Sequence, residues 1–399
     1  MSREYIIFRN SVIRVFLTIG IIVGLVLIMF TSSAGPWLQN PNLKGPYLSW
    51  VDDPTTTMTI SWQTPIQTNG IVQWGNTTNY GNSIAGSSSV DNLYSVTITG
   101  LEPNTIYHYR IISNIRNYTQ LVEDHWFKTA PNSTVSFSFI AYGDSRPDIF
   151  GNSGHRYVCN QMLKTEPNPA FILHTGDIVF QSNMENQWNQ FFYELKDIID
   201  HAPLFTALGN HEYNEFGGDY GWHYFNYFNY PAANNEWYYS FNYSNVHVIS
   251  LNLSVSDVQI SSAQINWLKN DLEKVNKSSN INWIVIFFHV PLYSSGGFGD
   301  DPLAISALEQ IFIDYKVDLV ISGHDHQYER MNVKGVQYIV TGGGGSELEV
   351  YIGGNEDVQY SENIHHFCLI EVNGLSMTIK TISSTGAIID QFTLNSKHP

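Results

Sequence analysis

Five short apolar segments of this chain each end in a residue that can bind a metal ion, and this arrangement constrains the fold most. Runs rich in Val, Ile, Phe and Leu, bounded by glycine or proline, are typical of buried strands, and the stretches between them are long enough for crossover helices. The sequence therefore predicts an alternating α/β architecture. The segments with their polar ends are Ser136–Tyr142 with Gly143-Asp144, Ala170–Thr175 with Gly176-Asp177, Pro203–Leu208 with Gly209-Asn210-His211-Glu212, Asn282–Phe288 with His289, and Val317–Ser322 with Gly323-His324-Asp325-His326.

The polar residues at the ends of these segments are candidates for one common site. In open α/β sheets, ligands gather outside the carboxyl ends of the strands. Residues that follow different strands can therefore meet although they lie far apart in the sequence. The candidate metal ligands are Asp144, Asp177, Asn210, His289, His324 and His326.

The donor atoms of these candidates restrict the metal. Carboxylate, amide and imidazole groups without a thiolate suit Mn, Fe or Zn, and three imidazoles argue against Mg or Ca alone. Six candidates are too many for one catalytic ion, whereas two ions about 3.5–4 Å apart and bridged by a carboxylate would use them all. We therefore expect two divalent or mixed-valence ions (Fe, Mn or Zn), bridged by Asp177.

The motifs resemble those of the calcineurin-like metallophosphoesterases and, within them, of the purple acid phosphatases. That family has a Gly-Asp, a Gly-Asp-x-x-Tyr, a Gly-Asn-His-Glu or Asp, a lone His after an apolar strand and a Gly-His-x-His, and the five segments supply these blocks in the same order. The resemblance runs from about Trp37 to the C-terminus. It implies a sandwich of two mixed β-sheets flanked by helices. It also implies that the first metal is held by Asp144, Asp177 and His326, and the second by Asp177, Asn210, His289 and His324.

One position departs from the family pattern. Where purple acid phosphatases have a Tyr that binds ferric iron and gives the colour, this chain has Phe180. We therefore expect a colourless protein whose first metal lacks one protein ligand. Other branches of the superfamily use a His two residues after the first Asp, but that residue here is Arg146. A water or His155 could fill the place, and Arg146 is instead a candidate for binding substrate phosphate.

The resemblance implies hydrolysis of a phosphoester by a metal-activated hydroxide that attacks phosphorus in line. His211 directly follows Asn210 and is the candidate that protonates the leaving oxygen; its alternative role is to orient Asn210 or a water. The sequence favours an acid-phosphatase-like phosphomonoesterase. A phosphodiesterase or nucleotidase remains an alternative, and an alternative of another class is a surface protein that binds a partner without catalysis.

A second domain is predicted before the first metal motif. Short Thr, Ser, Tyr and Val runs broken by turns are typical of a β-sandwich of about seven strands. The segment from Thr99 to Tyr109 resembles a fibronectin type III signature, and purple acid phosphatases carry such an all-β domain at the N-terminus. We therefore expect a fibronectin type III-like domain at residues 40–131 and the catalytic domain at residues 134–397.

The first 34 residues predict export. Val15–Phe30 has only Thr18 as a polar residue and follows three arginines. This pattern indicates a signal peptide or an uncleaved membrane anchor, and the length favours the anchor. We expect a protein that is secreted or membrane-anchored, with its catalytic domain outside the cytoplasm.

The charge of the chain bears on its partners. Against 36 Asp and Glu residues stand 19 Lys and Arg, which gives a formal net charge of −17. Binding to a phosphate backbone needs a basic face, so nucleic acid is not an expected partner. The expected partners are a phosphate ester and, with an uncleaved leader, the membrane; the oligomeric state stays open. The cysteines, Cys159 and Cys368, allow either a disulfide or two buried thiols.

Overall fold

The computed structural model describes residues 44–398, apart from 65–66, 116–117, 122, 214–219, 232–236, 254–259 and 350–355. The predicted export segment at residues 1–34 lies outside the described residues. Among the helices of the described part, none has the length and apolar character needed to cross a membrane.

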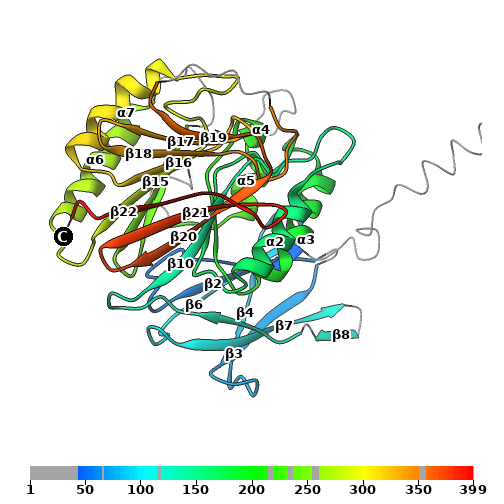
Figure 1. The fold of residues 1–399 in the computed structure, drawn as a ribbon. Coiled ribbons are helices and arrows are strands. Elements are labelled where there is room, and N and C mark those ends of the chain that lie inside the picture. Colours follow the sequence, from blue (N-terminus) through cyan, green and yellow to red (C-terminus); the bar gives the residue numbers. More distant parts are fainter. Residues whose placement is uncertain are drawn as a thin grey trace, which may run out of the picture. The chain divides into compact units, whose positions relative to one another are not determined.

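The N-terminal part folds into two antiparallel sheets (Figure 1). Tyr94 and Trp62 stack in the first sheet with ring centroids 5.4 Å apart, and the Tyr94 hydroxyl bonds the backbone of Thr68 just before the second sheet. The predicted all-β sandwich is thus confirmed, with nine strands in the described residues rather than about seven. The first sheet has the order β1 (Lys44–Ser49), β2 (Met58–Gln63), β6 (Leu93–Ile98) and β5 (Ser87–Ser88); the second has β4 (Asn82–Ala85), β3 (Asn69–Gly75), β7 (Ile106–Ile115) and β8 (Tyr118–Leu121), with β9 (His125–Lys128) also paired to β7, and the 3-10 turn η2 (Val90–Asn92) precedes β6.

The rest of the chain forms two mixed sheets with helices, which confirms the predicted fold class (Figure 1). The C-terminal segment adds three strands to the six-stranded sheet. That sheet has the order β12 (Leu204–Thr206), β11 (Ile172–His174), β10 (Phe137–Tyr142), β20 (His366–Asn373), β21 (Ser376–Ser383) and β22 (Ile388–Asn395). The seven-stranded sheet has the order β13 (Tyr239–Tyr243), β14 (Val246–Ser250), β15 (Trp283–Phe287), β16 (Leu319–Ser322), β18 (Val336–Thr341), β17 (Tyr328–Val333) and β19 (Val358–Glu362).

Helices connect and cover these strands. The described helices are α2 (His155–Thr165), α3 (Glu185–Ile199), α4 (Asn210–Tyr213), α5 (Trp222–Tyr227), α6 (Ser262–Asn276) and α7 (Pro302–Asp314). The Ser261 side chain caps α6, and the Asp301 side chain accepts two backbone N–H groups at the start of α7, where Pro302 occupies the first turn. These side chains satisfy backbone donors that have no partner within a helix, so they fix where α6 and α7 begin.

The alternation of side chains along β15 shows how the layers pack. Ile284 and Ile286 belong to an apolar cluster with Leu268 of α6 and Leu308 of α7. The intervening residues of β15 face the other way and join the cluster that includes the six-stranded sheet. Both faces of a parallel strand are therefore buried, which explains why this segment reads as a continuous apolar run.

The strand directions bring the predicted ligands to one edge. In the six-stranded sheet, β10, β11 and β12 run parallel, and in the seven-stranded sheet, β14, β15, β16 and β18 run parallel. The motif segments therefore all leave the sheets at carboxyl ends of parallel strands. This is the arrangement that the sequence predicted.

The sandwich part and the two-sheet part share a core. Trp50, just after β1, is fully buried. Its ring lies 5.3 Å from that of Phe205 in β12 and 5.6 Å from that of Phe241 in β13. A buried aromatic contact of this size fixes the two parts to each other.

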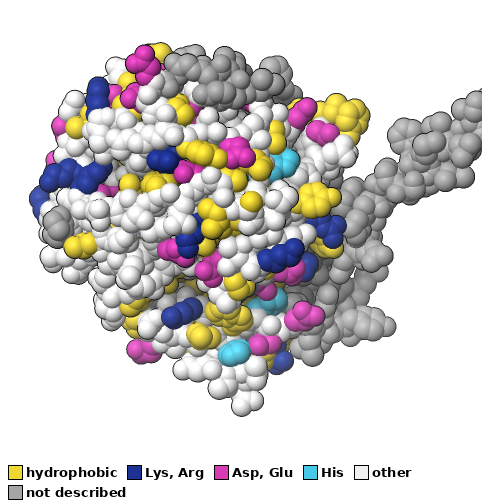
Figure 2. All heavy atoms as spheres, viewed as in Figure 1, with side chains coloured by type: hydrophobic (Ala, Val, Ile, Leu, Met, Phe, Trp, Pro, Cys, Tyr) yellow, Lys and Arg dark blue, Asp and Glu magenta, His cyan; other side chains and the backbone are white. Residues whose placement is uncertain are grey.

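The outer surface is mixed in character on the face drawn in Figure 2. Basic, acidic and apolar side chains are interspersed there among polar surface. The two cysteines, Cys159 and Cys368, are both buried and free. Of the two alternatives for them, the described structure contains the buried thiols.

Candidate metal centre

Three of the predicted ligands lie on unusual backbone. Asp144 (φ 59°), Asp177 (φ 56°) and His324 (φ 71°) are all in the left-handed region. Residues other than glycine rarely adopt this conformation, and it persists where the surroundings hold it. Here the Asp144 N–H donates to the carbonyl of Gly176 at 2.9 Å. The loops after β10 and β11 thus hold each other in shape.

Asp177 lies between two groups of candidate ligands. Its Oδ1 is 3.3 Å from His289 Nε2, while its Oδ2 is 3.4 Å from Arg146 Nε and 3.7 Å from His211 Nε2. Burial alone would raise the pKa of Asp177, but the surrounding His289, His211 and Arg146 outweigh it and lower this pKa below its usual range. A charged carboxylate with its two oxygens facing different neighbours is suited to bridging two ions.

The first group of acceptors surrounds His289. Its Nδ1–H donates to the carbonyl of Thr175 at 3.0 Å, which leaves Nε2 as the lone-pair atom of a neutral ring. That Nε2 lies 2.9 Å from Asn210 Oδ1 and 3.1 Å from His324 Nδ1. Burial, and next the His289 ring, lowers the pKa of His324 to about 3, so its ring is also neutral. Acceptor atoms this close to one another and to Asp177 fit a cation among them.

The second group consists of Asp144 and His326. His326 donates through Nδ1 to the carbonyl of Glu347 at 2.6 Å, and its Nε2 lies 3.6 Å from Asp144 Oδ1. Asp144 is fully buried, and burial followed by the nearby Asp177 raises its pKa well above the usual range. A bound cation would offset this cost of two buried carboxylates. Ligand atoms of Asp144, Asp177 and His289 all lie within 4.8 Å of one another.

The structure therefore brings all six predicted ligands to one edge of the two sheets. Asp144, Asp177 and Asn210 come from the six-stranded sheet and the helix start that follows it, whereas the three histidines come from the seven-stranded sheet. The donor set of carboxylates, an amide and neutral imidazoles fits Mn, Fe or Zn. The group around Asp144 has fewer protein donors than the group around His289, as expected from Phe180.

His155 lies away from these ligands. Its Nε2 faces the Tyr142 hydroxyl at 3.0 Å and its Nδ1 faces Glu194 at 3.0 Å, and its ring stacks on Phe191. Both ring nitrogens are engaged in this buried network. The possibility that His155 replaces the missing Tyr as a metal ligand is therefore wrong, and the physical reason is that α2 directs this ring into the core beneath the site.

His211 stands at the opening of the centre. Its backbone N–H donates to Asp177 Oδ1 at 3.2 Å, and its Nδ1–H donates to the carbonyl of Phe180 at 2.7 Å. The ring is 19% exposed, with Nε2 toward the Asp177 carboxylate. Its position is thus fixed by two hydrogen bonds, and Nε2 is the atom that can exchange a proton with a ligand.

Glu212 supports the centre, a role that the sequence did not predict. The fully buried carboxylate accepts backbone N–H groups of Asp177, Ile178, Val179 and Gly209 at 2.7–3.1 Å. Burial, and next the Asp177 charge, raises the pKa of Glu212 to about 8 against these donors. Glu212 thus ties the loop that carries Asp177 to the start of α4. Its place two residues after Asn210 was the only sequence signal.

His174 also supports the site. Its Nε2 bonds Ser145 Oγ at 3.0 Å and its Nδ1 accepts the Gly176 N–H at 3.2 Å. His174 therefore joins Ser145, which follows Asp144, to Gly176, which precedes Asp177.

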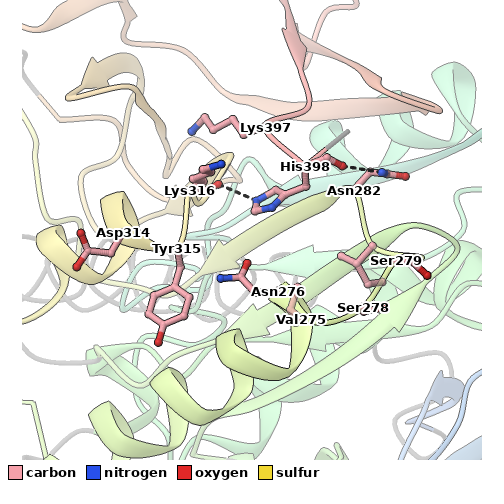
Figure 3. Close-up of a pocket in the computed structure, with 11 residues that line it drawn as sticks. Val275, Asn276, Ser278, Ser279, Asn282, Asp314, Tyr315, Lys316, Lys397 and His398 are labelled. Carbon is pink, nitrogen blue, oxygen red and sulfur yellow. Dashed lines mark hydrogen bonds between the residues drawn. The ribbon is translucent and has the colours of Figure 1, made fainter.

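A separate pocket lies at the opposite edge of the seven-stranded sheet (Figure 3). Asn282 precedes β15 and Lys316 precedes β16, so this pocket is at the amino ends of those strands. The ring of His398 bonds the carbonyl of Lys316, and the carbonyl of His398 accepts from Asn282, so the C-terminal segment closes one side. None of the predicted metal ligands lines it.

A two-sheet α/β fold with this donor set at the carboxyl ends of its strands defines a metallophosphoesterase-type protein. The chain matches the family model for the calcineurin-like phosphoesterase at residues 147–328, and that for the purple acid phosphatase N-terminal domain at residues 43–129. It therefore belongs to the purple acid phosphatase-like members of the calcineurin-like metallophosphoesterases. This membership implies a dinuclear metal centre, and the resemblance inferred from the motifs is confirmed.

Individual relatives agree with this membership. The chain is 28% identical over 305 residues to purple acid phosphatase 15 of Arabidopsis thaliana, covering 66% of this chain and 56% of that protein. It is 26% identical over 316 residues to acid phosphatase type 7 of Danio rerio, covering 69% and 68%. The solved structure of a purple acid phosphatase from yellow lupin (Lupinus luteus) shares the fold, with a TM-score of 0.79, 21% identity and coverage of 89% of this chain and 75% of that one. The match spans little more than half of the Arabidopsis protein.

Proposed function

We propose that this protein is a dinuclear metal-dependent phosphoester hydrolase, and that it acts as an acid-phosphatase-like phosphomonoesterase. The observation that carries this proposal is the convergence of His289 Nε2 with Asn210 Oδ1 and His324 Nδ1, at 2.9 and 3.1 Å, beside the charged Asp177. Acceptor atoms this close repel one another, and a cation bound among them removes this repulsion. The family names of the relatives point to the same class of reaction.

The residues have distinct roles in the proposed reaction. Asp144, Asp177 and His326 would hold one ion, and Asp177, Asn210, His289 and His324 the other. The pair would polarise the phosphoryl group and activate a water. His211 Nε2 would give a proton to the leaving oxygen, because Nδ1 is committed to the Phe180 carbonyl and fixes the ring. Glu212 would hold the loop that carries Asp177 against the start of α4, which carries Asn210.

Arg146 is a proposed contact for substrate phosphate. Its side chain is 18% exposed and lies beside the Asp177 carboxylate. A guanidinium presents several donors in one plane and suits the oxygens of a phosphoryl group. This role is compatible with the ion pair to Asp177, since different nitrogens can serve the two partners.

A phosphodiesterase or nucleotidase is the second candidate function. Phe298, on the loop after His289, lies with its ring centroid 4.1 Å from that of His324 and is 59% exposed. An exposed aromatic ring beside a ligand of the centre can stack on a base or an aryl group. This contact favours an ester that carries a planar leaving group, in either a monoester or a diester.

The test is hydrolysis of an aryl phosphomonoester and the matching aryl phosphodiester by the purified protein, loaded in turn with Mn, Zn and Fe. We expect faster release of phenol from the monoester. Faster release from the diester would move the protein to the phosphodiesterase alternative. No release with any metal would favour the non-catalytic surface protein.

Two variants separate catalysis from binding. Asp177→Asn and Asn210→Ala remove a bridge and a ligand, and the proposal expects each to lose turnover while the fold, followed by circular dichroism, is kept. Asn242→Ala, an exposed position on β13, is the control for Asn210→Ala. Unchanged turnover in Asp177→Asn would refute the proposal.

The remaining assignments belong to the same proposal. Residues 134–397 would form the catalytic domain and residues 40–131 the fibronectin type III-like domain. The apolar segment at Val15–Phe30 would direct export, with the catalytic domain outside the cytoplasm and the leader either cleaved or kept as an anchor. Protease protection of the expressed protein in sealed cells tests the orientation.

A further inference from the structure

Arg146 and Phe180 form a pair at the position where the family has its metal-binding Tyr. The guanidinium carbon lies 5.3 Å from the centroid of the Phe180 ring. Its Nε lies 3.4 Å from Asp177 Oδ2. The guanidinium is thus in contact with an apolar ring on one side and with the central carboxylate on the other, the two partners that stabilise an Arg in a partly buried place.

The backbone fixes this pair. The N–H of Arg146 donates to the carbonyl of Asp177 at 3.0 Å, and the carbonyl of Arg146 accepts from Ser346 Oγ at 3.2 Å. The buried Nε has no hydrogen-bond partner in the described residues and only the longer ion pair to Asp177. The side chain is therefore held near the carboxylates by charge and stacking, and an ion that bound there would compete with it.

The pair changes the charge of the group around Asp144. Replacing a Tyr ligand by Phe removes one negative donor, and Arg146 adds one fixed positive charge. Arg146 Nε lies 3.4 Å from Asp177 Oδ2, so this positive charge faces a carboxylate that the first metal position uses. The group around His289 and Asn210 keeps every protein ligand of the family pattern, whereas the group around Asp144 lacks the oxygen that Phe180 cannot supply.

We propose that Arg146 is a built-in cation of the first metal position, so that the two positions bind divalent ions with very different affinities. The ion held by Asp177, Asn210, His289 and His324 binds first and tightly. The position of Asp144, Asp177 and His326 takes its ion only when the guanidinium swings away from Asp177, and it disfavours a trivalent ion. This inference rests on the proposed metal centre and adds an order of filling to it.

The test is a titration of Mn²⁺ into the metal-stripped full-length protein, followed by calorimetry and by metal analysis after desalting. Wild type should retain one ion per chain, with a second that binds about 10–100-fold more weakly. In Arg146→Ala, the two affinities should differ by less than tenfold, and the protein should retain two ions per chain. Arg146→Lys, which keeps the charge, should stay close to wild type.

Two further variants make the result decisive. Arg156→Ala removes an exposed charge on α2 and should change neither affinity. Phe180→Tyr leaves Arg146 in place and adds a ligand oxygen, so it should strengthen the weak position even if Arg146→Ala folds poorly. Two equal affinities in wild type, or a ratio of affinities that Arg146→Ala leaves unchanged, would overturn this inference and leave the proposed metal centre intact. No retained ion in any variant would overturn the proposed metal centre itself.

Discussion

The backbone N–H of His324 donates to both carboxylate oxygens of Asp144, at 3.1 and 3.0 Å. This contact joins the loop after β16 of the seven-stranded sheet to the loop after β10 of the six-stranded sheet. Both residues have positive φ, so the two strained loops support each other. The centre therefore depends on how closely the two sheet edges approach.

Gly323→Ala tests this close approach. A Cβ at Gly323 would lie 2.2 Å from Asp144 Oδ2, a distance that forces the loops apart. We expect loss of metal from the Asp144 group and a fall in activity of about 100-fold, since small displacements at a site cost this much. Gly297→Ala is the matched control, because its Cβ would meet the nearest atom at 3.5 Å. Equal metal content in the two variants would contradict this view of the contact.

The sequence predicted the fold and the convergence of the six candidate ligands, because both follow from local signals. Apolar runs such as the one before Asp177 mark buried strands, and the parallel sheet then dictates that their polar ends meet. The lack of an oxygen at Phe180 was also visible at once. The predicted sandwich had too few strands because short edge strands such as β5, with two residues, give no periodic signal.

The contacts between distant segments were not predictable from the sequence. The four N–H groups that Glu212 accepts come mainly from a loop more than thirty residues earlier, and no local pattern announces them. His155 was a candidate ligand by position in the sequence, but the direction of α2 buries its ring. The stacking of Arg146 on Phe180 likewise depends on backbone geometry, which only the structure provides.

Glu212→Ala should destabilise the loop that carries Asp177. The change would leave four buried backbone N–H groups without their acceptor, and each unsatisfied group costs about 1–3 kcal/mol. We expect a loss of several kcal/mol in the free energy of unfolding and weaker metal retention, measured by denaturant titration and metal analysis. Glu371→Ala, a half-exposed position on β20, should change stability by less than about 0.5 kcal/mol. A Glu212→Ala variant as stable as this control would show that water replaces the carboxylate.

His211→Ala should reduce kcat without removing the metals. If His211 protonates the leaving oxygen, kcat should fall by about 10²–10⁴-fold for alkyl phosphates and by much less for nitrophenyl phosphate, whose leaving group needs no proton. Steady-state kinetics on both esters and metal analysis measure this. His108→Ala, in the N-terminal sandwich, is the control. An equal loss on both esters together with lost metal would favour the other role, in which His211 orients Asn210 or a water.

The contact between α3 and the N-terminal sandwich should make stability depend on pH. Asp200, at the end of α3, pairs with His125 of β9 at 2.9 Å and with His201 at 2.7 Å. Burial opposes the charge of Asp200, but the hydrogen bonds from the two histidines outweigh it and lower its pKa from 3.8 to about 2. Burial likewise opposes the charge of His201, but its bonds to Asp200 and Pro167 raise its pKa above 6.5.

The signs of the two shifts define a window of maximal stability. Because the folded pKa of Asp200 is lowered, its contribution is complete above pH 3.8 and is lost as pH falls toward about 2. Because the folded pKa of His201 is raised, its contribution is complete below pH 6.5 and is lost as pH rises through the folded value. The pair should therefore stabilise the protein most in the mildly acidic range between these limits.

Thermal melting of Asp200→Asn against wild type checks this window. The difference in stability should be on the order of 1 kcal/mol near pH 5, since Asp200 is partly exposed and solvent screens the pair. It should shrink as pH falls from 3.8 toward about 2, and again as pH rises above 6.5 through the raised folded pKa of His201. Asp197→Asn is the control on the same helix, because its side chain is 62% exposed and its pairing with Lys196 is at the surface. A difference between Asp200→Asn and wild type that stays constant both as pH falls toward about 2 and as it rises well above 6.5 would mean that neutral hydrogen bonds, rather than charge, hold the sandwich to α3.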